Sequence, residues 1–405
     1  MGFKIHEVRL GDICAFRAGS AFPRDNQGKT KGDHPFIKVS DMNAPENSWI
    51  ISRANNWISS SEAHDLKAKL QPKSATVFAK IGEALKADRT RLLSRPTLID
   101  NNMMAAVPKE SIDPLYLYYL ITSLKLSKWA EGSALPYLKQ KVLGDIVVRI
   151  PVHVEDQQRT SSILELIDRK IRINQRTNDY LAAIAEGVFE DWLLTAEGEP
   201  TPLSRFASFN PSTYSPKEKW PVVAYVDTGS VTRNHFDKPM VIDTATEKLP
   251  SRARRKVEDG DVIYSTVRPN QLHYGLVCNP PSNMLVSTGF TVARDSVGVG
   301  GPFIYLALTR PSITAKLQSV AEQSTSAYPS IKSSDLEQLE IPMPTKDEIE
   351  EIKPQLDSLF AAIAHNEYES KMLEELRDTL LPKLMSGEID VSQIELPMQP
   401  NNHLV

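Results

Sequence analysis

The sequence has only two cysteines and no long apolar run, and each shortage excludes a class of protein. Cys14 and Cys278 stand far apart without histidines at ligand spacing, so neither a disulfide framework nor a cysteine zinc site is expected. No run approaches the roughly 18 apolar residues of a membrane span, and the N-terminus lacks an apolar signal core. We therefore expect a cytoplasmic protein.

Recognisable catalytic motifs are also missing. Asn279-Pro-Pro-Ser282 resembles the motif of amino-methyltransferases, but Ser282 has no aromatic ring to stack on a base. Gly28-Lys29-Thr30 matches the end of a phosphate-binding loop whose first glycine would fall at Pro23. The eight histidines show no ligand spacing. We expect a non-catalytic chain that binds no metal and no cofactor.

Length and charge point to several folded parts. A chain of 405 residues exceeds what one hydrophobic core usually organises. Residues 1–154 hold 22 Lys and Arg against 15 Asp and Glu, a charge of +7, whereas residues 345–405 hold 5 against 13, a charge of −8. Residues 155–198 carry −4 and residues 199–344 carry +1. Positive segments are candidate polyanion surfaces, and acidic segments would be repelled from phosphate.

The first half of the chain resembles the second half. Leu10–Phe16 aligns with Leu203–Phe209, and Pro35–Asp41 aligns with Pro221–Asp227. Further along, Tyr137 and Lys141 through Pro151 align with Tyr328 and Lys332 through Pro342 at an offset of 191. Collinear blocks at similar offsets indicate a tandem repeat of a globular unit followed by a long helix.

The two long helices carry the clearest local pattern. Apolar and small polar residues recur at spacings of four and three in both copies, which predicts two heptad seams. Each helix would run about 40 residues, or about 60 Å, with Pro354 in the first turn of the second. Two matched seams favour pairing with each other, and a two-fold axis between the duplicated units would make that pairing antiparallel. The expected register pairs Asn178 with Asn366, Asn174 with Ser370, Ile171 with Leu373 and Leu181 with Ile363.

The globular parts read as mixed α/β. Predicted strands include Phe36–Val39, Thr76–Ala79, Asp145–Ile150, Val222–Val226 and Asp261–Ser265, and predicted helices span Leu115–Trp129 and Phe303–Val320. The fold class expected is therefore α/β (mixed α+β), with two tandem globular domains, two long helices forming an antiparallel coiled coil, and pseudo-two-fold symmetry.

Basic, amide and aromatic side chains gather in both halves in a manner typical of DNA binding. Lys and Arg neutralise phosphates, and Arg, Asn and Gln offer the bidentate groups that distinguish bases. The candidate DNA-binding residues are Lys29, Lys31, Lys80, Lys86, Arg89, Arg91, Arg95, Tyr137, Lys139, Lys141, Arg252, Arg254, Arg255, Lys256, Arg268, Asn270, Gln271, His273, Tyr328 and Lys332. Solvated loop charge is the alternative for each cluster taken alone.

Three stretches resemble one known family. They are Glu131–Tyr137 running to Val148–Pro151, Ala327–Lys332 running to Leu339–Pro344, and Leu380–Ile389, which closes the second helix. With the alternation of domain and helix, they are similar to the specificity (S) subunit of type I restriction-modification enzymes. The resemblance covers nearly the whole chain except the C-terminal stretch Val391–Val405. The Glu-Gln pair that often opens the family's helices is present only as Glu155-Asp156-Gln157 and as Asp347-Glu348.

The resemblance implies a division of labour. Residues 1–154 and 199–344 would be target-recognition domains, each reading one half of a bipartite, asymmetric DNA site, with a tail at 388–405. Helices at 155–198 and 345–387 would set the gap, up to roughly 17 base pairs for 60 Å. Two modification (methyltransferase) subunits that bind S-adenosylmethionine would dock on the chain, and a restriction (translocase and nuclease) subunit would join them.

Two other readings stay open on the residues alone. The chain could be an autonomous DNA-modifying enzyme with an unrecognised catalytic motif, or a coiled-coil scaffold that makes no contact with DNA.

Overall fold

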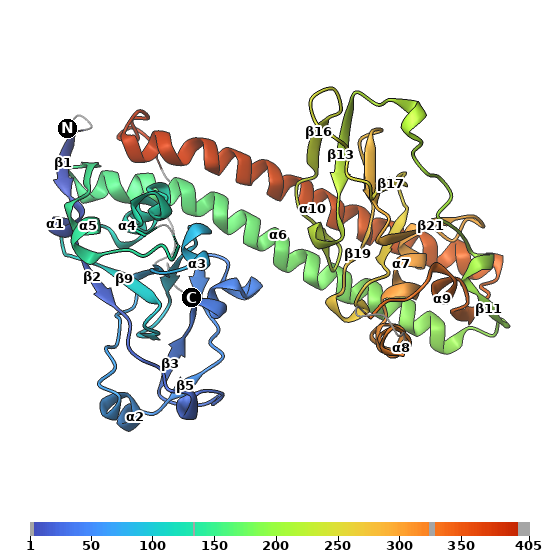
Figure 1. Cartoon of the computed structure of the whole chain (residues 1–405), viewed down its shortest axis with the longest axis horizontal. Coiled ribbons are helices and arrows are strands. Elements are labelled where there is room, and N and C mark those ends of the chain that lie inside the picture. Colours follow the sequence, from blue (N-terminus) through green and yellow to red (C-terminus); the bar gives the residue numbers. More distant parts are fainter. Residues whose placement is uncertain (1–3, 133, 324–328, 396–405) are drawn as a thin grey trace. The chain divides into compact units, whose positions relative to one another are not determined.

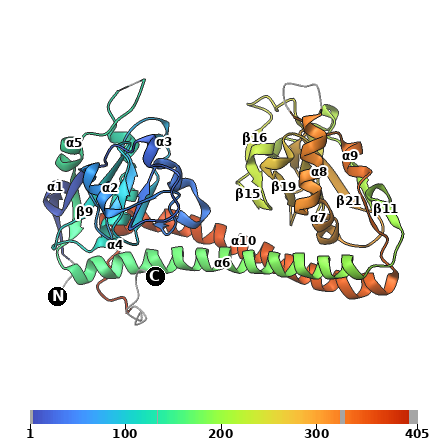
Figure 2. The ribbon, with the colours of Figure 1, turned by 90° about the horizontal axis from the view of Figure 1, so that it is seen from below.

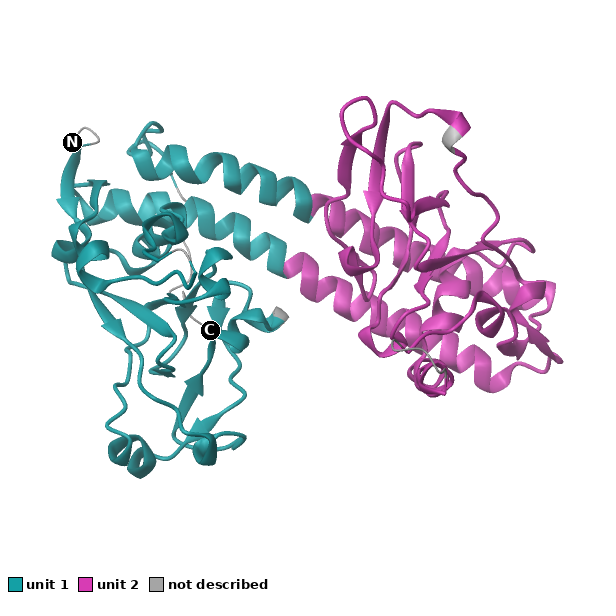
Figure 3. Cartoon of the chain, viewed as in Figure 1, with its two compact units in different colours: residues 1–172, 370–405 teal, residues 173–369 magenta. Residues whose placement is uncertain are grey.

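A computed structural model describes residues 4–132, 134–323 and 329–395 of the chain (Figure 1). The chain forms two compact units. Unit 1 comprises Met1–Arg172 and Ser370–Val405, and unit 2 comprises Ile173–Glu369 (Figure 3). Both units are mixed α/β and include part of each long helix, which confirms the fold class. The long helices are α6 (Val154–Thr195) and α10 (Lys346–Ser386), of 42 and 41 residues.

Unit 1 is built on a five-stranded sheet of order β2-β9-β6-β7-β4, a three-stranded sheet of order β5-β3-β8, and the pair β1-β10. Its elements are β1 (Ile5–Arg9), α1 (Leu10–Ile13), β2 (Cys14–Ala18), β3 (His34–Ile37), β4 (Ile50–Ile51), β5 (Trp57–Ile58), α2 (Ser60–Asp65), β6 (Thr76–Ala79), α3 (Glu83–Lys86), β7 (Thr90–Leu93), β8 (Leu98–Ile99), β9 (Met103–Pro108), α4 (Pro114–Ser123), α5 (Gln140–Asp145) and β10 (Val147–Pro151).

Unit 2 has two four-stranded sheets, β12-β21-β18-β19 and β16-β13-β20-β17, with the pairs β14-β15 and β11-β22. Its elements are β11 (Pro200–Pro202), β12 (Ala207–Phe209), β13 (Val222–Val226), β14 (Val231–Thr232), β15 (His235–Phe236), β16 (Met240–Asp243), β17 (Ala253–Lys256), β18 (Val262–Ser265), β19 (Tyr274–Leu276), β20 (Met284–Ser287), β21 (Phe290–Asp295), α7 (Gly301–Thr309), α8 (Pro311–Glu322), α9 (Ser333–Glu337) and β22 (Glu340–Pro342).

The same strand pairings recur in the two units. The first and last strands pair antiparallel in each, as β1 with β10 and as β11 with β22. A parallel pair also recurs, β3 with β8 and β13 with β20, and so does the antiparallel pairing of β6 with β9 and of β18 with β21. The repeat seen in the sequence is therefore a repeat of topology.

Two expected helices are interrupted. Leu115–Trp129 is helix α4 followed by a separate 3₁₀ turn, η4 (Leu126–Trp129). Phe303–Val320 divides into α7 and α8 because Arg310, which precedes Pro311, takes an extended ψ of 141° that ends the first helix. Proline at position 311 then starts the second helix.

Within each unit a stretch of α6 lies alongside a stretch of α10, in opposite directions (Figures 1 and 2). In each unit the sheets and short helices cover one side of this helix pair (Figure 2). Pro354 lies two turns beyond the start of α10 rather than in its first turn, so the carbonyl four residues earlier has no helical N–H donor.

The end of α10 belongs to the core of unit 1. Leu381, Leu384 and Met385 are buried with Leu10 and Tyr116, and Val391 beyond the helix is fully buried in the same cluster. The segment expected as a tail, 388–405, thus begins with packed residues, and residues 396–405 lie outside the described part. The corresponding core of unit 2 is built around Phe189, Trp192, Phe206 and Phe303.

Candidate DNA-recognition surfaces

One loop of unit 1, between β6 and β7, is anchored at its base by three backbone hydrogen bonds. Lys80 N–H donates to the Asn102 carbonyl at 2.8 Å, and Lys80 O accepts from Leu138 N–H at 2.8 Å. Gly82 N–H donates to Pro136 O at 2.8 Å, and Ile81 forms a β-bridge with Tyr137. The loop and the segment before α5 therefore hold each other in place.

The loop between β18 and β19 of unit 2 has the same anchors. Thr266 N–H donates to Gly289 O at 2.8 Å, and Thr266 O accepts from Ile331 N–H at 2.9 Å. Arg268 N–H donates to Pro329 O at 3.0 Å, and Val267 forms a bridge with Ser330. These contacts make Gly82 and Arg268 equivalent positions, and likewise Pro136 and Pro329.

This equivalence corrects one step of the sequence alignment. Pro136 and Pro329 differ by 193 positions, so Lys332 corresponds to Lys139, not to Lys141. Lys139 precedes α5 and Lys332 precedes α9 as the N-cap residues. The offset returns to 191 at Pro151 and Pro342 because the segment from Lys139 to Pro151 is two residues longer. Tyr328, the other residue of that alignment, lies outside the described residues.

Several candidate cations of unit 1 are already bonded to neighbours. Lys29 pairs with Glu62, and this hydrogen bond is the first cause that lowers the pKa of Glu62 to about 2. Lys139 pairs with Glu131 at 2.6 Å, and Lys86 pairs with Glu83 at 2.6 Å. Exposed pairs of this kind are weakly held and can exchange a carboxylate for a phosphate.

Other unit 1 candidates differ in accessibility. Lys31, Lys141 and Tyr137 are exposed, and Lys80 is half-buried. The Arg95 guanidinium lies 5.8 Å from the ring centre of Trp57. A surface cation stacked on an aromatic ring is pre-oriented, which suits contact with nucleic acid.

Arg89 and Arg91 have unlike environments. The Arg91 guanidinium donates to Met42 O at 2.8 Å and to Thr90 O at 2.7 Å, and burial lowers its pKa. Arg91 therefore fastens the segment after β3 to β7. Arg89 is exposed and donates to the Asn43 side chain at 2.9 Å.

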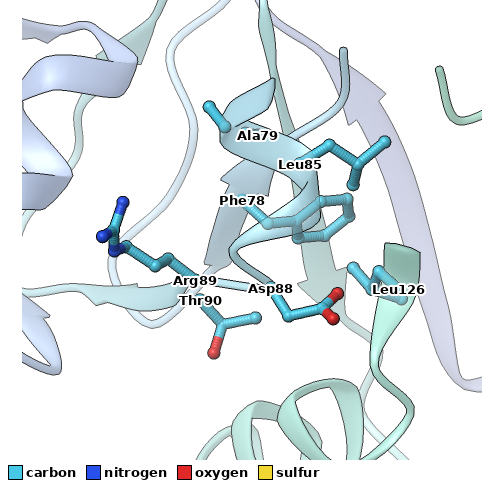
Figure 4. A pocket seen from close by; sticks show the side chains of 8 residues that line it. Phe78, Ala79, Leu85, Asp88, Arg89, Thr90 and Leu126 are labelled. Carbon is cyan, nitrogen blue, oxygen red and sulfur yellow. The ribbon is translucent and has the colours of Figure 1, made fainter. Parts of the chain in front are cut away.

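Asp88 sets the direction of Arg89. Its carboxylate accepts from Ser127 N–H at 2.7 Å and from the Ser127 hydroxyl at 2.6 Å, while its own φ is 49°. Figure 4 shows Asp88 pointing toward Leu126 and Arg89 pointing the opposite way. The small pocket between them, about 10 Å³, is closed by Phe78 and Leu85 and is too small for a ligand.

The unit 2 candidates fall on two different sheets. Arg254, Arg255 and Lys256 belong to β17, where Lys256 pairs with Glu218 and lies 5.2 Å from the ring centre of Trp220. Burial lowers the pKa of Arg255, and Arg252 just before β17 is exposed. Lys332 is exposed at the start of α9.

The second unit 2 group lies in the loop between β18 and β19. Arg268, Asn270 and Gln271 are exposed there. His273 is half-buried, and its Nδ1 donates to Val231 O at 2.7 Å. This hydrogen bond ties the end of the loop to β14.

Sequence reasoning missed the β14–β15 hairpin beside this loop. Its turn residues Arg233 and Asn234 both have positive φ, and their N–H groups donate to Leu272 O and Tyr274 O, each at 2.9 Å. An asparagine between two short β-branched or aromatic segments is a known turn signal that could have revealed the hairpin.

The helix pair has polar residues at its centre. Asn366 Nδ2 donates to Asn178 Oδ1 at 2.8 Å, and Asn178 Nδ2 donates to Ile363 O at 3.2 Å. Asn174 Nδ2 donates to Asn366 O at 3.3 Å and to Glu369 at 2.8 Å. The first contact joins two residues that the expected register sets opposite each other. Ile171 is buried, whereas Leu181, Ser370 and Leu373 are half-buried.

Large apolar side chains remain exposed on the long helices. In unit 2 they are Ile173, Tyr180, Ile184, Leu194 and Tyr368, of which Leu194 is 83% exposed. In unit 1 they are Leu166, Met372 and Leu376. Apolar residues clustered on an exposed helix are typical of surfaces that bind other proteins.

Two further findings concern metal sites and membrane spans. No group of three or more His, Cys, Asp or Glu within residues 4–132, 134–323 and 329–395 is placed to hold a metal ion. Within the same ranges, no helix has both the length and the apolar character that a membrane span requires.

Comparisons with known proteins agree with this architecture. Residues 4–183 match the family model of the type I restriction modification DNA specificity domain. The type I restriction enzyme MjaIX specificity subunit of Methanocaldococcus jannaschii is 23% identical, over 95% of this chain and 94% of its own. The HindI specificity subunit of Haemophilus influenzae is 27% identical over 40% of this chain and 35% of its own.

The fold is also found in a solved structure. The crystal structure of a type I restriction-modification S subunit from M. genitalium matches 95% of this chain and 96% of that one, with a TM-score of 0.58 at 12% identity. The family match covers the first repeat, and the shared loop anchors carry the equivalence into the second. Residues 4–183 thus match the DNA specificity domain family of type I restriction-modification enzymes, and the chain as a whole is similar in sequence to a specificity subunit of that class.

Proposed function

We propose that the chain is the DNA sequence-specificity subunit of a type I restriction-modification complex. Each globular unit reads one half of a bipartite, asymmetric DNA target, and the paired helices set the spacer. The chain itself carries no catalysis and acts where the DNA lies, in the cytoplasm.

The observation that carries this proposal is that the two units hold equivalent loops with the same backbone hydrogen bonds, while the side chains of these loops differ. The loop after β6 and the loop after β18 share their anchors, but they present different side chains. A frame repeated with different reading residues recognises two different half-sites, which is what an asymmetric target requires.

The long helices support the spacer role. A helix of 42 residues is about 63 Å long, which corresponds to roughly 18 base pairs. The hydrogen-bonded Asn178 and Asn366 pair inside an apolar seam disfavours shifted registers, so the spacing would be a fixed one.

Catalysis would come from partner subunits. Two modification subunits, each binding S-adenosylmethionine, would dock on the helices, where the exposed apolar residues offer contact area. A restriction subunit with translocase and nuclease activity would join them. The acidic charge of the two helices suits protein contact better than DNA contact.

Methylation mapping tests the function. The chain co-expressed with its modification subunits should direct adenine methylation to one bipartite sequence, and binding of the complex to that site should weaken steeply with salt. Methyl transfer by the purified chain without partners would contradict a non-catalytic role. Binding that does not change with salt would instead favour a scaffold.

The spacer role has its own test. Deleting seven residues, two turns, from both helices should shorten the preferred gap and leave both half-site sequences unaltered. The matched control replaces seven exposed helical residues by alanine without a deletion. An unchanged gap in the deletion variant would remove the helices from spacing.

A further inference from the structure

The equivalent loop positions Gly82 and Arg268 both have a positive φ but differ in ψ. Gly82 has φ 76° and ψ −162°, a region open essentially to glycine alone, whereas Arg268 has φ 49° and ψ 70°, in the left-handed helical region. Both N–H groups bond the carbonyl of an equivalent proline. The repeated frame thus requires a positive φ here, and only unit 1 fills the position with glycine, the residue that adopts a positive φ without strain.

An arginine at this position is costly to the fold. A residue with a Cβ in the left-handed region loses roughly 1 kcal/mol relative to glycine. Such strain concentrates at functional sites, where the side chain is retained for what it contacts. Arg268 is exposed, so burial in the core does not account for its presence.

The loop around Arg268 is held rigid from both sides. Leu272, also left-handed at φ 59°, accepts the Arg233 N–H through its carbonyl at 2.9 Å. Asn270 N–H donates to the Gln318 side chain of α8 at 3.1 Å. Pro269, between Arg268 and Asn270 in the sequence, is buried. A loop fixed in this way loses little conformational entropy on binding.

Three exposed side chains project from this rigid loop within four positions. They are Arg268, Asn270 and Gln271. Arginine pairs bidentately with the guanine edge in the major groove, and asparagine and glutamine pair bidentately with adenine. No acidic residue occurs from Val267 to Tyr274 to oppose DNA.

We infer that the loop 268–271 determines the sequence read by unit 2, with Arg268 contacting a guanine and Asn270 or Gln271 contacting an adenine of the same half-site. This inference rests on the proposed function and names the reading element within it. In unit 1 the equivalent loop contains helix α3, where Lys86 pairs with Glu83. The side chains that this loop offers to DNA bases therefore differ from those of unit 2.

The decisive variant is Arg268→Gly. It supplies the residue that the backbone favours, so unit 2 should fold at least as well as the wild type. In the complex with the modification subunits, methylation of a library with randomised half-sites should lose preference at one base pair of one half-site. The expected loss is roughly 5- to 150-fold for that base pair, with the other half-site unchanged.

The matched control is Asn279→Gly. Asn279 is also exposed and left-handed, at φ 46°, but lies in the turn between β19 and β20. Its replacement should leave both half-sites unaltered. Asn270→Ala and Gln271→Ala provide independent variants that keep the backbone, and one of them should relax preference at an A·T pair.

The outcomes separate the two proposals. If the wild-type complex shows no sequence preference, the proposed function fails. If the wild type is specific and Arg268→Gly is equally specific, the inference about the loop is wrong while the function stands. A uniform loss of affinity for every sequence, with a shallower salt dependence, would make Arg268 a phosphate contact and would also overturn the inference.

Discussion

In both units the globular part contacts the long helices, but unit 1 makes this contact with polar and charged side chains and unit 2 makes it with apolar ones. In unit 1, Tyr119 of α4 donates its hydroxyl to Asp168 at 2.7 Å, and Arg377 donates to the same carboxylate at 2.9 Å. The two long helices repeat at an offset of 192 positions, which makes Phe360 the unit 2 equivalent of Asp168. The Phe360 ring packs edge-on against Tyr305, with ring centres 5.3 Å apart. The unit 2 equivalent of Arg377 is Ala185, which is fully buried.

The difference shows that the two repeats share their backbone arrangement, whereas the side chains that join the globular part to the helices differ between them. It also makes the two halves non-interchangeable. If the α6 stretch of unit 1 paired with the α6 stretch of unit 2 in a second copy, Asp168 would meet Ala185 and lack a cation. A buried carboxylate without a partner is strongly unfavourable, so the ionic contact favours pairing of unlike stretches.

The largest effect is expected from removing one ion. Arg377→Met should destabilise unit 1 by about 3–5 kcal/mol, because Asp168 would stay buried without its cation. Denaturant unfolding followed by tryptophan fluorescence, with hydrogen exchange of unit 1 amides, measures the loss. Arg169→Met, an exposed cation on α6, serves as control and should change stability by less than about 0.5 kcal/mol.

The aromatic contact of unit 2 should respond somewhat less. Phe360→Ala removes a buried ring from the cluster with Tyr305 and should cost about 3 kcal/mol. Hydrogen exchange should report this loss in unit 2 amides. Tyr368→Ala, at an exposed site on α10, should leave exchange unaltered. Equal losses in both units would break the comparison, since each contact would then serve the whole chain.

Much of this comparison was accessible from sequence, and part of it was not. The heptad spacing predicted both long helices and their pairing, because a seam sustained along a whole helix and then repeated has few alternative explanations. The antiparallel direction came from the two-fold relation expected between the repeated units. The repeat predicted equivalent sheets. By contrast, the contact of Tyr119, Asp168 and Arg377 joins residues that are 49 and 209 positions apart, and no local pattern marks such a meeting.

The candidate DNA residues were less predictable than the fold. Arg91 and Arg89 look alike in sequence, yet one guanidinium bonds backbone carbonyls inside unit 1 and the other is exposed. Lys332 was aligned with Lys141 because the two-residue difference in the segment leading to β10 and β22 is invisible without the loop anchors. Burial and backbone hydrogen bonds decide which cation reaches solvent, and composition does not reveal them.

A smaller effect should sharpen the comparison at the loops. Gly82→Ala should destabilise unit 1 by about 1–3 kcal/mol, because φ 76° with ψ −162° is a conformation essentially restricted to glycine, although the nearest atom, of Leu135 at 3.6 Å, leaves room for a Cβ. Arg268→Gly at the equivalent position should change stability in the opposite direction. Thermal unfolding of both variants measures the pair, and changes of the same sign would show that the two loops do not share one frame.

The smallest effect tests whether unit 1 needs the ionic contact of Asp168 with Arg377 for its stability. Replacing the three polar residues together, as Tyr119→Phe, Asp168→Leu and Arg377→Leu, leaves none of the three positions with a buried charge or hydroxyl. Unit 1 should then be within about 1 kcal/mol of the wild type, since apolar groups of similar volume often substitute for a buried ion pair. Denaturant unfolding beside the single Arg377→Met variant supplies the measurement.

The two outcomes of this triple replacement assign different roles to the ions. Recovery of stability would mean that unit 1 tolerates the chemistry of unit 2, and that its ions select the pairing partner more than they stabilise the fold. A loss as large as that of the single variant would mean that the ionic contact itself holds α4 to the helices, because apolar contact at the same three positions would then have failed to replace it.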